Sequence, residues 1–199
     1  PCGRLIKAKY AFVPDERVAM IDAAMASGIQ SVKTDVGFVN PVMTSSAGTG
    51  ELIMAASRQG ATKIIVGLGG TGTTDAGIGL MGALGAKLYD SYNQLLPANI
   101  SSINLIDHID LSEIATKRLQ LVACTDVDGP LTGTAGAVQM FGPQEGLTDA
   151  NLKDFERRFQ HFAQQVDPIN QGQLAGDGAA GGMGFALRLL GASVVPGFQ

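Results

Sequence analysis

Apolar and polar positions along the chain form short hydrophobic runs separated by glycine-rich turns. Alternation of apolar with polar or charged residues over Arg4–Ala11 predicts a strand with one exposed face. The segment 17–29 begins as a buried strand that carries Asp22 and continues into a small-residue turn. Two more buried strands are predicted, one at Lys63–Gly67 and one over 118–127, and the second of these ends in acids.

Helical patterns follow these runs. The segment 45–61 predicts a loop that leads into a helix, with Glu51 in the first turn and Gly60 at the C-terminal cap. A second helix is predicted over Asp75–Lys87, whereas residues 90–113 are predicted mostly as loop with a short strand.

The clearest helical pattern begins at Thr148, which can cap the helix together with Asn151. Its apolar stripe consists of Leu152, Phe155, Phe159 and Phe162. Before it, residues 129–146 predict a loop with one helical turn. After it, residues 176–195 predict a glycine-rich turn, a helix and a short strand. Because strands alternate with helices, we expect an α/β fold with a mixed sheet and flanking helices.

Composition narrows the class of protein. The chain has 199 residues, 45% of them hydrophobic and 16% charged, so we expect residues 1–199 to form a single folded domain. A net charge of -4 indicates no nucleic-acid partner, and no apolar run is long enough to predict a membrane span. Cys2 and Cys124 are too few for a disulfide framework, and a reduced cytoplasmic protein is expected.

The loop after the strand at Lys63–Gly67 is the first candidate site. A strand, a glycine-rich turn and a helix together present free backbone amides to an anion. The expected substrate- or phosphate-binding residues are Gly69, Gly70, Thr71, Gly72, Thr73 and Thr74. Asp75 could orient a cation or a substrate hydroxyl, or alternatively only cap the helix that follows. The segment lacks the terminal Gly-Lys-Ser/Thr of a P-loop and the acid that a dinucleotide site requires.

Two acids after the strand over 118–127 form the second candidate site. Asp126 and Asp128 suit metal binding or proton abstraction from a hydroxyl, and they would point the same way if the strand continued that far. The alternative is a turn with its own local hydrogen bonds, since Asp-Gly and Gly-Pro are turn signals.

A third candidate precedes the helix predicted within 45–61. Its hydroxyls and glycines predict a second anion site, formed by Ser45, Ser46, Gly48, Thr49 and Gly50. Helix capping alone is the alternative. Close packing is the better explanation for the glycines of 175–184.

Taken in order, these segments resemble the type I glycerate kinase family. The resemblance rests on "SSAGTGELI", "GLGGTGTTDAGIGLMGALGA", "VACTDVDGPL", "FGPQEG" and "GAAGGMGFAL", and it covers about Val18 to Pro196. It implies ATP-dependent phosphorylation of glycerate, typically at the 2-hydroxyl. Asp75 or Asp126 would act as general base or metal-positioning acid, with Asp128 as a metal ligand and Mg²⁺ as the metal.

The resemblance also implies that the chain is one part of a two-domain kinase. It matches the inserted α/β domain, whereas the Rossmann-like domain built from both ends of the full polypeptide has no counterpart here. The chain starts at Pro1 without an initiator Met, as expected of an excised piece or of trimmed ends. The isolated fragment is therefore expected to be inactive, with the missing domain and glycerate as partners and a homodimer as a further association.

Three positions depart from the family pattern. Thr125 is inserted before Asp126, Gly129 stands where Asn is common, and Asp177 occupies a position usually held by a small residue. The alternatives to glycerate phosphorylation are a non-catalytic ligand-binding or dimerisation module and a kinase for another small hydroxy acid.

Overall fold

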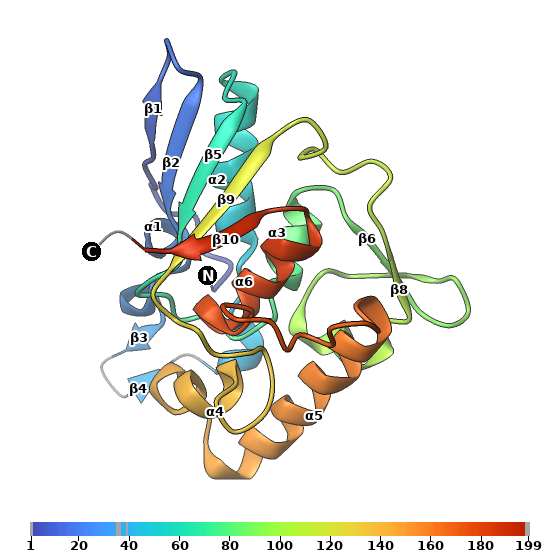
Figure 1. Ribbon diagram of the computed structural model, residues 1–199. Helices are drawn as coiled ribbons and strands as arrows, with labels where there is room; N and C mark the ends of the chain where they lie inside the picture. The colour runs from blue at the N-terminus through green and yellow to red at the C-terminus, as the bar shows by residue number, and fades with distance from the viewer. Residues whose placement is uncertain (1, 35–36, 39, 198–199) are drawn as a thin grey trace.

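A five-stranded sheet forms the centre of the computed structural model, which describes residues 2–34, 37–38 and 40–197 (Figure 1). Across the sheet the strands are β1 (Ala11–Val13), β2 (Val18–Asp22), β5 (Lys63–Gly67), β9 (Gln120–Thr125) and β10 (Ser193–Pro196). The last four are parallel, whereas β1 is antiparallel to β2. The expected α/β class with a mixed sheet is confirmed.

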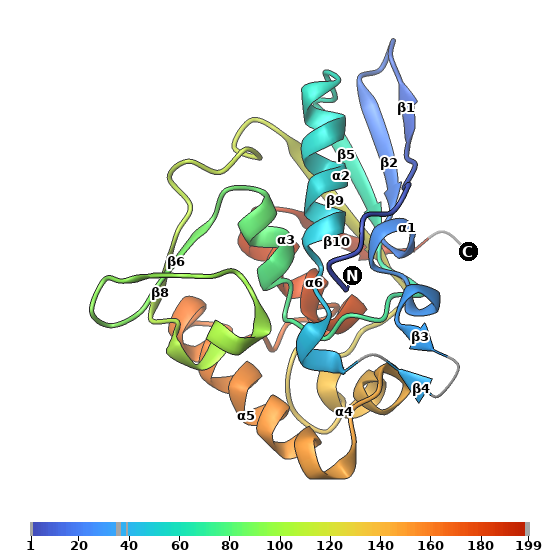
Figure 2. The same ribbon diagram turned by 180° about the vertical axis from the view of Figure 1, so that it is seen from behind.

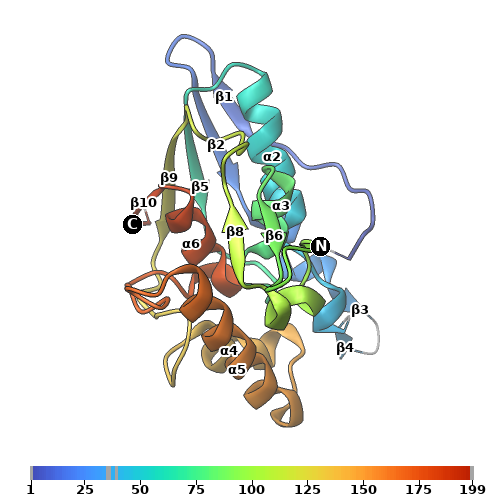
Figure 3. The ribbon, with the colours of Figure 1, turned by 90° about the vertical axis from the view of Figure 1, so that its right-hand side faces the viewer.

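The parallel strands lie side by side in the same order as they occur along the chain. Right-handed crossovers between such neighbours place every connecting helix on one face of the sheet. Accordingly, α2 (Ala47–Arg58) lies behind the sheet in Figure 1 and in front of it in Figure 2. Viewed from the side, α2 and α3 (Ile78–Ala83) are on the same side of the strands (Figure 3).

Side-chain alternation along the strands reflects this one-sided covering. The residues directed to the helices are buried, and they include Ala19, Ile21, Ile64, Val66, Leu121 and Ala123. On the opposite face, Met20, Ile65 and Val122 are in register on neighbouring strands, and Met20 is 45% exposed. The core of the domain therefore lies between one face of the sheet and its helices.

Close contact between α2 and α3 depends on a glycine. A Cβ atom at Gly50 would lie 2.6 Å from the carbonyl oxygen of Leu80, so a larger residue would push the helices apart. The prediction of one helix over Asp75–Lys87 was wrong in length. The helix begins at Ile78 and ends at Ala83, because Gly85 has a φ of +99° and the chain then enters a strand.

The remaining elements extend the domain beyond the central sheet. β6 (Lys87–Tyr89), β7 (Leu95–Leu96) and β8 (His108–Asp110) form an antiparallel sheet, and β3 (Lys33–Thr34) pairs with β4 (Gly37–Phe38). The short helices are α1 (Ala24–Ser27), α4 (Ala137–Phe141) and the 3-10 segments η1 (Ile29–Ser31), η2 (Pro41–Met43), η3 (Ile100–Leu105) and η4 (Gly142–Glu145). The longer helices are α5 (Asp149–Val166) and α6 (Ala179–Leu189).

The pattern for α5 predicted both its start and its buried face. Thr148 is its N-cap residue and forms a capping box with Asn151. Phe155, Phe159 and Phe162 are buried, as expected of its apolar stripe.

Two local predictions near the start of the chain were wrong. Of the strand expected over Arg4–Ala11, only Ala11 belongs to a strand, because pairing with β2 begins there. Glu51 lies beyond the first turn of α2, since the helix starts earlier, at Ala47. Gly60 follows the C-cap residue Gln59 with a φ of +105°, which suits glycine at a helix end.

Candidate functional site

The carboxyl ends of the four parallel strands meet at one edge of the sheet. Asp22 ends β2, Gly67 ends β5 and Thr125 ends β9. Open α/β sheets bind ligands at this edge, because the loops that leave it converge there. The glycine-rich loop after β5 and the acidic loop after β9 are therefore adjacent, as their positions after parallel strands predict.

Two adjoining cavities occupy this edge. The first has a volume of about 540 Å³ and is lined by Asp22, Ala24, Gly67, Leu68, Gly69, Gly70, Cys124, Thr125, Asp126 and Gly197. The second, about 320 Å³, is lined by Ile29, Leu68, Gly69, Gly70, Thr71, Asp126, Val127, Phe141, Gln144, Glu145, Ala180 and Gly181. Leu68, Gly69, Gly70 and Asp126 line both, so these residues form the centre of the candidate site. We call the second cavity the Glu145 cavity.

Gly69 and Gly70 line both cavities, and their backbone amides take no part in the hydrogen bonds that hold the loop. The loop is held through its oxygen atoms and through Gly72, since Ile29 donates to the carbonyl of Gly70 and Gly72 donates to that of Ser27, each at 2.9 Å. Within residues 2–34, 37–38 and 40–197, the amides of Gly69 and Gly70 donate no backbone hydrogen bond. Both residues are exposed. This arrangement suits an anion, for which backbone amides are effective donors.

Asp126 is the acid of the β9 loop that reaches the cavities. β9 ends at Thr125, so the strand does not continue through Asp126 and Asp128, and they do not share a face by strand alternation. Instead the chain turns, with the amide of Val127 donating to Thr125 Oγ1 at 3.0 Å. Asp128 is exposed and lines neither cavity. The described ranges contain no group of three or more His, Cys, Asp or Glu arranged to hold a metal ion.

Asp75 lies in the interior and not on a cavity wall. It is 1% exposed, and its Oδ2 atom accepts hydrogen bonds from Ser46 N, Ser46 Oγ and Gly79 N at 2.8, 2.9 and 3.2 Å. Its Oδ1 atom accepts from Gly77 N at 3.0 Å. Burial raises the pKa of this carboxyl above its usual range, and the four donors oppose that effect. Asp75 thus joins the start of α2 to the start of α3, although the N-cap residue of α3 is Gly77 and not Asp75.

The threonines of the glycine-rich loop differ in their surroundings. Thr71 lines the Glu145 cavity and is 8% exposed. Thr73 and Thr74 are buried behind it, and Thr74 Oγ1 donates a hydrogen bond to Glu145. Gly72 is also buried, so only the first part of the predicted segment, Gly69–Thr71, is open to a ligand.

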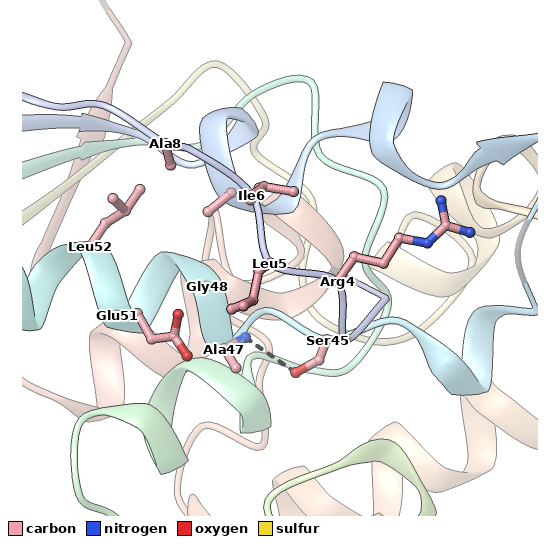
Figure 4. A pocket seen from close by; sticks show the side chains of 11 residues that line it. Arg4, Leu5, Ile6, Ala8, Ser45, Ala47, Gly48, Glu51 and Leu52 are labelled. Atoms are coloured by element: carbon pink, nitrogen blue, oxygen red, sulfur yellow. Dashed lines mark hydrogen bonds between the residues drawn. The ribbon is translucent and has the colours of Figure 1, made fainter.

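The loop before α2 opens into a separate cavity of about 500 Å³. This cavity lies between the N-terminal segment and the start of α2, and its wall includes Ser45, Gly48 and Glu51 (Figure 4). Ser45 Oγ accepts a hydrogen bond from Ala47 N at 3.2 Å, which satisfies a donor of the first helical turn. In the described part of the chain, no residue lines both this cavity and either of the two at the sheet edge.

The other residues expected in that loop are mainly structural in this arrangement. Ser46 binds Asp75, Thr49 Oγ1 lies 2.8 Å from Ser27 Oγ, and Gly50 contacts α3. The two predicted anion loops are therefore connected through Asp75, but their exposed residues face different cavities.

Glu145 is a candidate site residue that the sequence analysis did not single out. It ends η4, is 3% exposed and lines the Glu145 cavity, and its carboxylate accepts a hydrogen bond from Thr74 of the glycine-rich loop. Burial, together with the nearby charge of Asp75, raises its pKa to about 8, although the bond from Thr74 acts in the opposite direction. Its sequence signal is weak, because a single Glu between Gln and Gly gives no indication of burial.

The left-handed start of α6 completes the Glu145 cavity. Ala180, Gly181 and Gly182 have positive φ values, of 54°, 63° and 97°. A Cβ atom at Gly181 would lie 1.7 Å from the carbonyl oxygen of Thr73, so only glycine fits there. The glycines of 175–184 thus serve close packing, as expected, while Ala180 and Gly181 also form part of the cavity wall.

Asp177, which departs from the family pattern, forms an ion pair with Arg188. Asp177 is buried, and its Oδ1 atom accepts from Arg188 Nε at 2.6 Å. Burial raises the pKa of Asp177, and the adjacent guanidinium opposes that shift. The pair lies outside both sheet-edge cavities.

Comparison with known proteins agrees with the motifs and the architecture. The sequence profile of the Glycerate kinase family matches residues 1–199. The chain belongs to the glycerate kinase family. It is 37% identical to the glycerate 2-kinase of Escherichia coli K12, over all of this chain and 53% of that protein. It is 36% identical to the glycerate kinase of Bacillus subtilis 168, over 94% of this chain and 50% of that protein.

A solved structure gives the same result for the fold. A crystal structure from Salmonella typhimurium LT2, of a protein described as a candidate glycerate kinase 2, superposes with a TM-score of 0.89 at 35% identity. The superposed region covers 99% of this chain and 54% of the chain in that crystal structure. The chain thus spans about half the length of the curated relatives it matches. Among the described residues, no helix is both long and apolar enough to span a membrane.

Proposed function

We propose that this chain is the inserted domain of an ATP-dependent kinase that phosphorylates glycerate, with the 2-hydroxyl as the acceptor. The observation that carries the proposal is the pair of exposed residues Gly69 and Gly70. They line both cavities together with Asp126, and within the described residues their amides donate no backbone hydrogen bond. Phosphoryl transfer depends mainly on positioning and on charge stabilisation, and this edge supplies anion donors beside an acid.

Each candidate residue then has a distinct task. The amides of Gly69 and Gly70 hold a carboxylate or phosphate oxygen. Asp126 accepts the proton of the substrate hydroxyl or, together with Asp22 in the same cavity, holds magnesium. Magnesium, when bound, would neutralise phosphate charge, and one or two carboxylates are its usual protein ligands in phosphoryl-transfer sites. Asp75 acts as a positioning residue, because its oxygens are already occupied by four internal donors.

Positive charge must come from outside this part of the protein. Among the residues that the structure describes, no Lys, Arg or His lines either cavity at the sheet edge. A phosphoryl group carries negative charge that kinases stabilise with metal ions and basic side chains. We therefore propose that the half of the polypeptide missing from this chain supplies basic residues across the cleft, and that the fragment alone is inactive. A cytoplasmic location and a homodimer both stay predictions.

The experiment is ADP formation from MgATP in the presence of glycerate, measured in parallel for the 199-residue chain and the complete polypeptide. Activity that depends on glycerate and appears only in the complete polypeptide is the expected result. Phosphorus NMR of the product then distinguishes the 2-phosphate from the 3-phosphate.

Two other results would change the assignment. Turnover with lactate or malate but not with glycerate would indicate a kinase for another hydroxy acid. No turnover with any acceptor, combined with tight glycerate binding, would indicate a binding module and would overturn the proposed kinase.

A further inference from the structure

Glu145 lines the Glu145 cavity together with residues of the loops after β5 and β9. Phe141 and Gln144, close to Glu145 in the chain, also line the cavity, as do Gly69, Gly70 and Thr71 of the glycine-rich loop. The side chain of Glu145 is buried and its carboxylate accepts the hydroxyl hydrogen of Thr74. A buried acid therefore shares a small cavity with the exposed residues Gly69 and Gly70.

Within the described residues, the charged groups next to Glu145 or in its cavity lining are acidic. Asp75, from the loop before α3, and Asp126, from the loop after β9, are the titratable groups that face it or share its cavity. The helices packed against α4 contribute no charged residue to the cavity wall, since α6 supplies only Ala180 and Gly181 and α5 supplies none within the described residues. An ionised Glu145 would therefore repel an anion without a compensating cation.

We propose that Glu145 makes anion binding in this cavity dependent on a proton: the carboxyl must be protonated for an anionic group to bind at the amides of Gly69 and Gly70. This role rests on the proposed function, in which those amides hold the carboxylate or phosphate of a substrate. Glu145 is thus a specificity-determining residue that couples substrate charge to pH.

The direction of the effect follows from the environment of the carboxyl. Because the pKa of Glu145 is raised to about 8, the side chain is neutral at pH 7 and ionised at pH 9. When only the protonated form binds, the apparent dissociation constant rises as that form is depleted. Binding of an anion also stabilises the protonated form, so anion binding draws protons from solution in proportion to the ionised fraction of Glu145.

The first test is calorimetric titration of the complete polypeptide with sulfate, whose charge is constant over this pH range. The dissociation constant is expected to be roughly tenfold larger at pH 9 than at pH 7. Titrations at pH 8 in buffers of different ionisation enthalpy should reveal an uptake of about half a proton per sulfate. A constant affinity with no proton uptake in the wild type overturns the proposal without recourse to any variant.

Variants assign the proton to Glu145. Glu145→Gln should remove the proton uptake and reduce the pH dependence to less than about twofold, whereas Glu145→Asp, which retains an acid, should preserve both. Glu16→Gln is the matched control, because Glu16 is an exposed acid in the turn between β1 and β2. Persistence of the full pH dependence in Glu145→Gln would assign it to another group and overturn the proposal.

The same titration with glycerate separates this inference from the proposed function. If ADP formation depends on glycerate but the affinity for glycerate and sulfate does not change with pH, the proposed kinase function stands and only the role of Glu145 is overturned. Proton-linked binding of sulfate without any ADP formation would retain that role and overturn the kinase.

Discussion

Asp75 Oδ2 accepts hydrogen bonds from both the amide and the hydroxyl of Ser46, at 2.8 and 2.9 Å. Ser46 Oγ in turn accepts from Leu80 N at 2.9 Å. The first residues of α2 and α3 are therefore connected through one buried carboxylate. The glycine-rich loop precedes Asp75 directly, so the position of the exposed amides depends on this connection.

Replacing Asp75 by Asn should lower the stability of the protein and its turnover together. An amide NH₂ group would face donors that now bind a carboxylate oxygen, at a cost of about 1–3 kcal/mol in the free energy of unfolding. Turnover in the complete polypeptide should fall by more than about tenfold, the lower end of a catalytic effect. Chemical denaturation and steady-state kinetics measure the two effects. Lost turnover at unchanged stability would instead place Asp75 in contact with the substrate.

Asp126→Asn should affect turnover alone. Asp126 is exposed and lines both cavities, so its replacement removes a base or metal ligand without disturbing the interior. We expect kcat to fall by more than about tenfold with an unchanged melting temperature. Asp128→Asn, two residues further on and outside the cavities, is the control and should retain turnover. Near-normal rates in both Asp75→Asn and Asp126→Asn would contradict the site assignment.

Glu145→Gln should stabilise the protein increasingly as the pH rises. In the unfolded chain Glu145 ionises near pH 4.5, whereas in the folded protein it keeps its proton to about pH 8. Between these values the folded state binds more protons, so its stability falls with rising pH, by up to about 1.4 kcal/mol per unit. Denaturation of wild type and variant at pH 5, 6.5 and 8 measures the difference. Parallel stability curves would show that Glu145 ionises normally in the folded state.

Arg188→Leu should be strongly destabilising because it leaves Asp177 buried without its cation. Removing one partner of a buried ion pair typically costs about 3–5 kcal/mol. The double variant Asp177→Ala, Arg188→Leu should recover most of that loss, since the resemblance implies a small residue at position 177. Thermal unfolding of both variants measures the two losses of stability. Equal loss in the single and the double variant would mean that Arg188 acts through its bond to the carbonyl of Ala175.

Local patterns predicted the elements whose signals lie within the element itself. β5 coincides with the predicted Lys63–Gly67, and α5 begins at the predicted cap because its apolar stripe and capping residues agree. Elements that depend on a partner were predicted less well. Apolar and polar residues alternate over Arg4–Ala11 as in a strand. Within the described residues, however, pairing with β2 begins only at Ala11, and alternation alone does not form a strand.

Burial explains why the site was only partly predicted. Glycines and threonines in one loop look equivalent along the chain, yet packing exposes Gly69 and buries Thr73. Asp75 and Asp126 look like similar acids after strands, yet only Asp126 reaches a cavity. Glu145 depends on a contact with Thr74, 71 residues earlier in the chain, which no local pattern encodes.

The turn between β1 and β2 lies at the end of the sheet opposite to the site, since β2 runs from Val18 toward Asp22 at the cavity edge. This exposed turn is therefore a suitable attachment point for a spectroscopic label (Figure 1). A cysteine introduced there by Glu16→Cys would react readily, whereas burial raises the pKa of Cys124 and keeps its thiol protonated. After Cys2 is replaced by Ser, a dye on this turn would label the protein at one position, at the end of the sheet away from the two cavities.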